Sequence, residues 1–148
     1  MKQMHFEIEV NASKETVWKT LWQDETLRQW AGLIDPETYM IGELQEGQEV
    51  QFISAEGYGV ISLVAKLVPY EYVLFRHKAD TKDEGEHTRE DQWTGGDESY
   101  LLTSKDADST VLALTFDVPV ELEEIMNASY PQALAKIKEL SEQSASDE

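Results

Sequence analysis

The sequence has 148 residues, of which 41% are hydrophobic and 28% charged, and this composition is typical of one globular domain rather than of a disordered chain. Thirty acidic against 12 basic residues give a formal net charge of −18, which disfavours binding to nucleic acid or to anionic membrane surfaces. The absence of cysteine excludes a disulfide framework and thiol chemistry.

The N-terminal segment alternates apolar and acidic residues. Phe6, Ile8 and Val10 alternate with glutamates, which predicts a half-buried strand over residues 4–10. This segment has no apolar core of signal-peptide length, and nothing in the sequence approaches the ~18 apolar residues of a membrane helix. We therefore expect a cytoplasmic protein that does not bind membranes.

Two short helices are expected after this strand. Ser13 is a favourable N-cap for a helix over residues 14–22. Asp24 is a second N-cap candidate, for a short helix that carries Trp30. Gly32 and Pro36 end this helical section.

From residue 37 onward the sequence predicts strands and turns. Alternating apolar residues between glycines and prolines predict strands over residues 39–41, 50–54, 58–68, 71–79, 98–105 and 109–117. Residues 80–91 are polar, rich in charge and without periodicity, so we expect a long loop or a poorly ordered insertion there.

A last helix is expected over residues 121–143, because apolar residues recur there at the spacing of one helical face. Since most of the preceding chain is predicted as strands, this helix must pack across a sheet, and we expect the function in the space between them. Pro131 either kinks the helix or begins a second helix after a first that ends near Asn127; we favour the kink. The tail, residues 144–148, should be frayed.

This order of elements and three stretches of sequence resemble the SRPBCC or START-like superfamily. The stretches are residues 12–21 continuing to Trp30, then Trp93 with residues 100–102 and 109–112, and finally residues 130–140. The branch that they resemble most comprises bacterial proteins related to the C-terminal domain of the Hsp90 ATPase activator. The resemblance covers about residues 4–142, except the acidic insertion over residues 80–91.

The resemblance implies an α+β helix-grip fold, in which a curved antiparallel sheet wraps around a long C-terminal helix and two short helices follow the first strand. One START-like domain would then occupy residues 1–143. The superfamily has no shared catalytic motif, so the fold constrains the function only weakly.

The residues themselves offer no catalytic or metal-binding motif. His5, His77 and His87 lack the spacing of metal ligands, and no nucleophile elbow is present. We therefore assign no metal, no cofactor and no catalytic residue. His77 shares a strand face with Val73 and Phe75, so its ring either enters an apolar cavity or is held at the rim of the sheet.

Many aromatic residues are expected to face the interior, by alternation along strands or by helical phase. Any one ring could simply fill the core, but the tyrosine hydroxyl groups suit a ligand cavity with a few polar points. The expected ligand-binding residues are Trp30, Tyr39, Phe52, Phe75, His77, Tyr100, Leu114, Phe116, Met126, Tyr130 and Leu134.

These observations favour a module that binds a small hydrophobic or aromatic ligand between the sheet and the last helix. A chaperone-activator-like interaction domain, with a chaperone as its partner, is the first alternative. A cyclase-like or hydrolase-like enzyme that uses the same cavity, with His77 as acid or base, is the second. The sequence specifies neither the ligand nor the oligomeric state.

Overall fold

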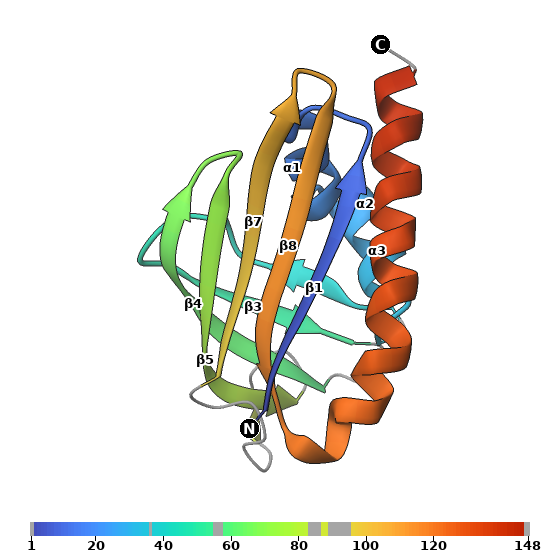
Figure 1. The fold of residues 1–148 in the computed structure, drawn as a ribbon. Coiled ribbons are helices and arrows are strands. Elements are labelled where there is room, and N and C mark those ends of the chain that lie inside the picture. Colours follow the sequence, from blue (N-terminus) through green and yellow to red (C-terminus); the bar gives the residue numbers. More distant parts are fainter. Residues whose placement is uncertain (1, 36, 55–57, 83–86, 89–95, 147–148) are drawn as a thin grey trace.

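The computed structural model describes residues 2–35, 37–54, 58–82, 87–88 and 96–146, and shows an α+β fold (Figure 1). In chain order its elements are β1 (Lys2–Val10), α1 (Lys14–Trp22), α2 (Asp24–Ala31), β2 (Tyr39–Ile41), β3 (Glu49–Ile53), β4 (Tyr58–Val68), β5 (Tyr72–Lys82), β6 (His87–Thr88), β7 (Asp97–Asp106), β8 (Ser109–Val118), the short 3₁₀ helix η1 (Val120–Leu122) and α3 (Glu123–Ser146).

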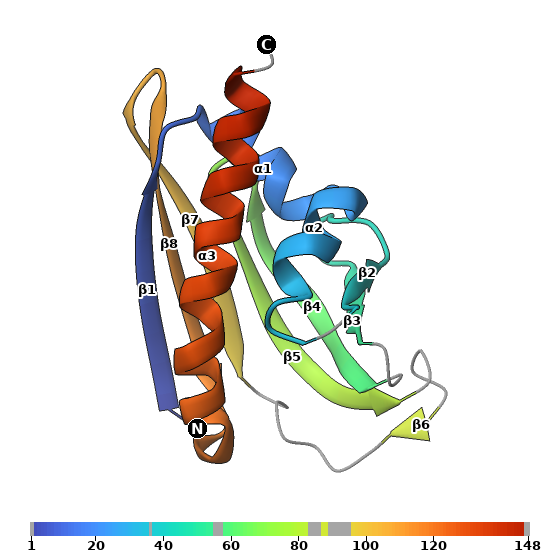
Figure 2. The same cartoon turned by 90° about the vertical axis from the view of Figure 1, so that its right-hand side faces the viewer.

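The described strands form one antiparallel sheet in the order β1-β8-β7-β5-β4-β3-β2, with β6 paired to β5. The sheet curls, and α3 lies along its concave side with α1 and α2 beside it (Figure 2). Register shifts interrupt the pairing of β4 with β5 at Ile61/Ser62 and at Val64/Lys66, and such irregularities bend and twist a sheet. This is the helix-grip arrangement expected from the sequence.

The core lies between the sheet and α3. Every second side chain of β8, including Leu112, Leu114 and Phe116, is buried, as its alternating sequence predicts. On α3 the buried side chains include Tyr130 and Ile137, and the rings of Phe116 and Tyr130 stack with centroids 4.4 Å apart. Burial of this apolar face holds the helix on the sheet.

The two short helices begin as their sequences allow. The Ser13 hydroxyl accepts a hydrogen bond from the backbone N–H of Thr16, which confirms Ser13 as the N-cap of α1. Asp24 is not an N-cap: it is the first residue of α2, whose N-cap is Gln23 without a side-chain hydrogen bond. The Asp24 carboxylate instead pairs with Arg28 one turn later, so its charge favours the helix through that pair and the dipole.

The last helix runs without a break from Glu123 to Ser146 and contains Pro131, so the alternative of two successive helices is wrong. Residues 121–122 belong to η1 rather than to the helix. The helix includes residues 144–146, while residues 147–148 lie outside the described part of the chain. The backbone N–H of Asn11 donates to Glu142 at 3.0 Å, a tertiary contact that the sequence could not show.

The acidic segment is partly structured, contrary to expectation. Strand β5 continues to Lys82, and β6 pairs with residues 81–82. Residues 83–86 and 89–95, which include Trp93, lie outside the described residues.

None of the described helices is both long and apolar enough to span a bilayer.

Candidate functional site

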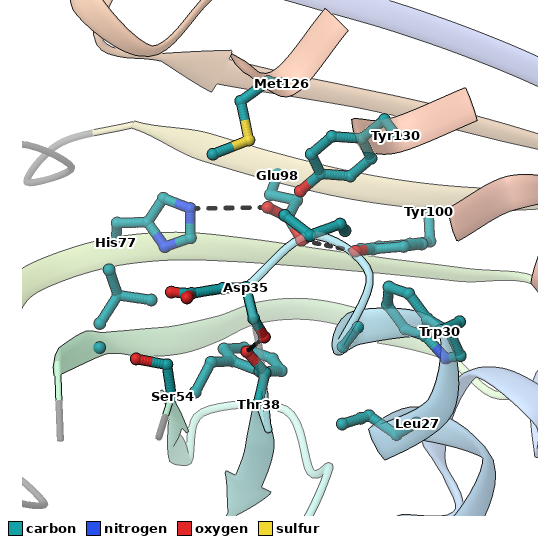
Figure 3. A pocket seen from close by; sticks show the side chains of 15 residues that line it. Leu27, Trp30, Asp35, Thr38, Ser54, His77, Glu98, Tyr100, Met126 and Tyr130 are labelled. Carbon is teal, nitrogen blue, oxygen red and sulfur yellow. Dashed lines mark hydrogen bonds and ion pairs between the residues drawn. The ribbon is translucent and has the colours of Figure 1, made fainter. Parts of the chain in front are cut away.

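A cavity of about 150 Å³, partly open to solvent, lies between the concave face of the sheet and helices α2 and α3 (Figure 3). Its described lining comes from six elements and the turns beside them, and it consists of Leu27, Trp30, Ala31, Ile34, Asp35, Thr38, Phe52, Ser54, Gly59, Val60, His77, Glu98, Tyr100, Met126 and Tyr130. Most of these side chains are apolar or aromatic, which is typical of small-molecule sites.

One wall of the cavity consists of aromatic rings that hold one another in place. The indole N–H of Trp30 donates to the backbone carbonyl of Leu21 at 3.2 Å, so α2 is fixed against the end of α1. The Trp30 and Tyr100 rings meet edge to face at 6.3 Å, and Phe52 meets Phe75 at 5.4 Å, almost perpendicular. Such edge-to-face packing leaves little rotational freedom, so this wall is pre-formed.

The close approach of β3 and β4 at the cavity depends on a glycine. Gly59 lies opposite Ile53 in the register, and a Cβ atom at this position would lie 2.0 Å from the carbonyl oxygen of Phe52. No other residue type fits there without moving the strand.

One group of polar side chains in the cavity centres on His77 and Glu98. The buried His77 ring approaches the buried Ser62 hydroxyl through Nδ1 at 2.7 Å, and its Nε2 lies 3.9 Å from Oε1 of Glu98. The Tyr100 hydroxyl donates to Oε2 of Glu98 at 2.6 Å. Figure 3 shows His77, Glu98 and Tyr100 on one side of the cavity, with the polar residues Asp35, Ser54 and Thr38 below them.

The two tyrosines of the cavity are held in their neutral form. Burial is the main cause that raises the pKa of Tyr100 well above its usual value, followed by the negative charge of Glu98. Burial and then Glu98 raise the pKa of Tyr130 in the same way. Both groups therefore keep their proton near neutral pH, and that of Tyr100 is donated to Glu98.

The structure brings together six of the residues expected at a ligand site. Trp30, Phe52, His77, Tyr100, Met126 and Tyr130 line the cavity. The alternation that placed His77 on the core face with Val73 and Phe75 is confirmed by their burial, and the ring lies in the cavity rather than at an exposed rim.

The other five expected residues lie elsewhere. Phe75, Leu114, Phe116 and Leu134 are buried behind the lining as core residues. Tyr39 is half-buried on β2, where the Arg28 guanidinium lies 4.9 Å from the centre of its ring. Periodicity identifies the inward face of an element, but it does not show which part of that face another element covers.

Sequence reasoning missed nine lining residues: Leu27, Ala31, Ile34, Asp35, Thr38, Ser54, Gly59, Val60 and Glu98. A signal existed for Glu98, which lies two residues before Tyr100 and hence on the same strand face. Helical spacing from Trp30 could have indicated Leu27 and Ile34. Asp35 and Thr38 lie in the turn after α2, where the spacing of residues in the sequence does not predict which way their side chains point.

In the described part of the chain, no group of histidine, aspartate and glutamate side chains is arranged to hold a metal ion. The described lining can form hydrogen bonds through two carboxylates, an imidazole, two phenols and the hydroxyl groups of Ser54 and Thr38, within an apolar surround.

No protein-family model and no curated protein matches the sequence. Solved structures do match. Protein MLL2253 from Mesorhizobium loti is 14% identical, with a TM-score of 0.74 over 96% of this chain and 98% of that one. A START superfamily protein from Mycobacterium smegmatis is 16% identical, with a TM-score of 0.68 over 95% and 97%.

The Aha1 dimer from Colwellia psychrerythraea is similar to the same extent, at 20% identity and a TM-score of 0.65 over 95% of this chain and 94% of that one. At these identities the likeness concerns the fold. The resemblance that the sequence suggested is thus confirmed at that level: the chain has the START-like helix-grip fold, which it shares with the START superfamily protein and with Aha1.

Proposed function

We propose that the protein binds a small apolar or aromatic molecule in the cavity between the sheet, α2 and α3. This proposal rests on the cavity itself, which combines an aromatic wall with a few polar groups. Apolar cavities of about this volume accommodate a molecule the size of benzene, so a ligand with one ring, or two small rings, fits best.

The lining combines fixed and adjustable parts. Trp30 and Tyr100 are held by ring packing and hydrogen bonds, which lowers the entropic cost of binding. Met126, from α3, is half-buried at the cavity and has an unbranched, flexible side chain that can adjust to a ligand's shape.

A heteronuclear NMR titration with toluene, phenol and indole tests this function. We expect chemical-shift changes at Trp30, Tyr100, Met126 and Tyr130, and smaller changes at the outer face of the sheet. If none of the three probes shifts the lining residues, the cavity is a packing defect of the core and the proposal is wrong.

A cavity-filling variant provides the control. Ala31 lines the cavity, so Ala31→Met places a flexible side chain in the ligand's space. We expect at least about tenfold weaker binding, equivalent to ~1.4 kcal/mol. Ala113→Met is the matched control, because Ala113 is half-buried on β8 outside the lining, and its binding should equal that of the wild type.

Catalysis in the same cavity is the second candidate function, and the approach of His77 to Glu98 favours it. The test uses whichever probes bind: mass spectrometry of the recovered probe should show a product with the wild type and none with His77→Asn. Unchanged probe in both cases, with binding intact, would leave the protein a binding module.

A further inference from the structure

The cavity contains a carboxylate that pairs with no lysine or arginine among the described side chains. Glu98 lies on the same face of β7 as Tyr100, and only 14% of its side chain is exposed. Its contacts are the Tyr100 hydroxyl at 2.6 Å and His77 Nε2 at 3.9 Å. By contrast, some acidic residues on the surface pair with lysine or arginine, as Glu49 does with Lys78 and Asp97 with Arg76.

A carboxylate removed from water without a counter-ion is unfavourable, and one donated hydrogen bond compensates for only part of the lost hydration. The negative charge of Glu98 also acts on its surroundings, since it contributes to the raised pKa of both Tyr100 and Tyr130. A cation placed beside Glu98 would therefore be stabilised more than the same cation in water.

The rest of the lining favours a cation and disfavours an anion. Its described part contains a second carboxylate, Asp35, and neither lysine nor arginine. The faces of aromatic rings attract cations, and Trp30, Phe52, Tyr100 and Tyr130 supply four rings. The net charge of −18 adds a long-range attraction for cations and a repulsion for anions such as fatty acids or aryl carboxylates.

We propose that the ligand of this cavity is a small arylalkylamine, whose ring packs against the aromatic wall and whose ammonium group lies beside Glu98. This inference rests on the proposed function and gives its ligand a chemical class. The ammonium donates to Glu98, while His77, held by Ser62, lies on the other side of the same carboxylate.

Three probes with one ring and a short linker test the ligand class: 2-phenylethylamine, 2-phenylethanol and 3-phenylpropionate. Calorimetric titration measures the affinity of each probe. At about pH 8 the amine stays protonated, since alkylamines lose their proton near pH 10. About 0.15 M KCl screens the long-range field. We expect the amine to bind about tenfold more tightly than the alcohol, and the carboxylate more weakly than the alcohol.

Glu98→Gln keeps the size of the side chain and one acceptor oxygen for the Tyr100 hydroxyl, but removes the charge. In this variant the amine should bind no more tightly than the alcohol, and the alcohol should bind as in the wild type. Glu25→Gln makes the same change in net charge at an exposed residue of α2 outside the lining, and should preserve the amine preference.

The outcomes separate the two proposals. If the alcohol binds as tightly as the amine in the wild type, or if Glu98→Gln retains the amine preference, the ligand class is wrong and the binding function stands. If none of the three probes binds, both fail. The comparison of probes in the wild type needs no variant, so it can disprove the ligand class even if Glu98→Gln does not fold.

Discussion

Two phenol groups lie close to one carboxylate inside the cavity, and this arrangement makes the titration of Tyr100 and Tyr130 informative. Both side chains are buried, and Glu98 adds negative charge beside them. A phenolate at either position would be poorly hydrated and close to another anion. The alkaline titration of the protein therefore reports whether this cluster is assembled.

We expect Tyr100 and Tyr130 to ionise only as the protein unfolds. Their pKa values are raised in the folded state, so the stability that they contribute is complete below the unfolded value of about 10 and is lost as the pH rises above it. Phenolate absorbance measured against pH should show a normal phase and a delayed phase among the six tyrosines.

Two variants assign the phases of this titration. Tyr130→Phe should remove amplitude from the delayed phase, and Tyr70→Phe, at a residue that is 42% exposed, should remove it from the normal phase. A single phase near pH 10 in the folded protein would contradict the burial of the two cavity tyrosines.

Two serines that are both fully buried differ in whether the hydroxyl group is bonded. The Ser62 hydroxyl lies 2.7 Å from Nδ1 of His77, whereas the Ser141 hydroxyl has no hydrogen-bond partner among the described residues. Ser62→Ala should therefore destabilise the protein by about 1–3 kcal/mol, because the buried imidazole nitrogen loses its partner.

Ser141→Ala is the matched control, and chemical denaturation measures both variants. At Ser141 the substitution removes a polar atom without a bond and introduces a better helix former, so we expect no loss and a gain of up to about 0.5–1 kcal/mol. If the two substitutions destabilise the protein equally, the loss of stability in Ser62→Ala comes from the lost volume and not from the hydrogen bond to His77.

At the scale of the element, α3 tolerates a proline that its local sequence disfavours. Pro131 is exposed, so its ring points away from the sheet, while the neighbouring Tyr130 and Ala133 are buried against it. Lys138 donates to the backbone carbonyl of Glu9 at 3.1 Å and pairs with Glu142, which fixes the second half of the helix on β1. Packing on both sides of the proline outweighs the cost of the lost backbone hydrogen bond.

Pro131→Ala should therefore stabilise the protein. Alanine restores the backbone hydrogen bond of the helix, a gain of ~3 kcal/mol in helix propensity, offset by ~0.4–1 kcal/mol for a more flexible unfolded chain. We expect a net gain of about 2 kcal/mol in the free energy of unfolding, measured by denaturant titration.

The neighbouring exposed residue serves as the control for this substitution. Gln132→Ala should change stability by less than about 0.5 kcal/mol. If Pro131→Ala were neutral or destabilising, the proline would fit a bend in the helix that packing on the sheet requires.

At the scale of the whole molecule, the net charge of −18 opposes compaction because acidic residues repel one another across the surface. The ion pairs include Lys2–Glu123, Lys14–Glu71 and Lys105–Glu9, which are largely exposed and individually weak. Repulsion should therefore outweigh pairing in the response to salt.

Raising KCl from about 0.01 to 0.3 M shortens the screening length from ~30 Å to below ~10 Å and should raise the melting temperature. If screening the repulsion raises the free energy of unfolding by about 1 kcal/mol, the melting temperature of a chain of this size should rise by ~2–4 °C. Chloride is preferred to sulfate, which stabilises most proteins by exclusion from their surface. A melting temperature that falls with KCl would show that the ion pairs dominate.

The sequence by itself determined the helix-grip fold. Alternation along Leu112, Leu114 and Phe116, and helical spacing around Tyr130 and Ile137, are local consequences of which side chains avoid water. Such periodicity requires no knowledge of the partner element, so the order of elements and the packing of α3 on the sheet were predictable.

Only the tertiary structure decided where the cavity lies and what lines it. Phe116 and Tyr100 have the same pattern in sequence, yet Phe116 packs under Tyr130 in the core and Tyr100 lines the cavity. Which part of an inward face stays uncovered depends on how α2 and the turn after it lie across the sheet. Glu98 shows the physical reason most directly: its environment is formed by β5, β7 and α3 together, and no local pattern in the sequence describes the meeting of the three.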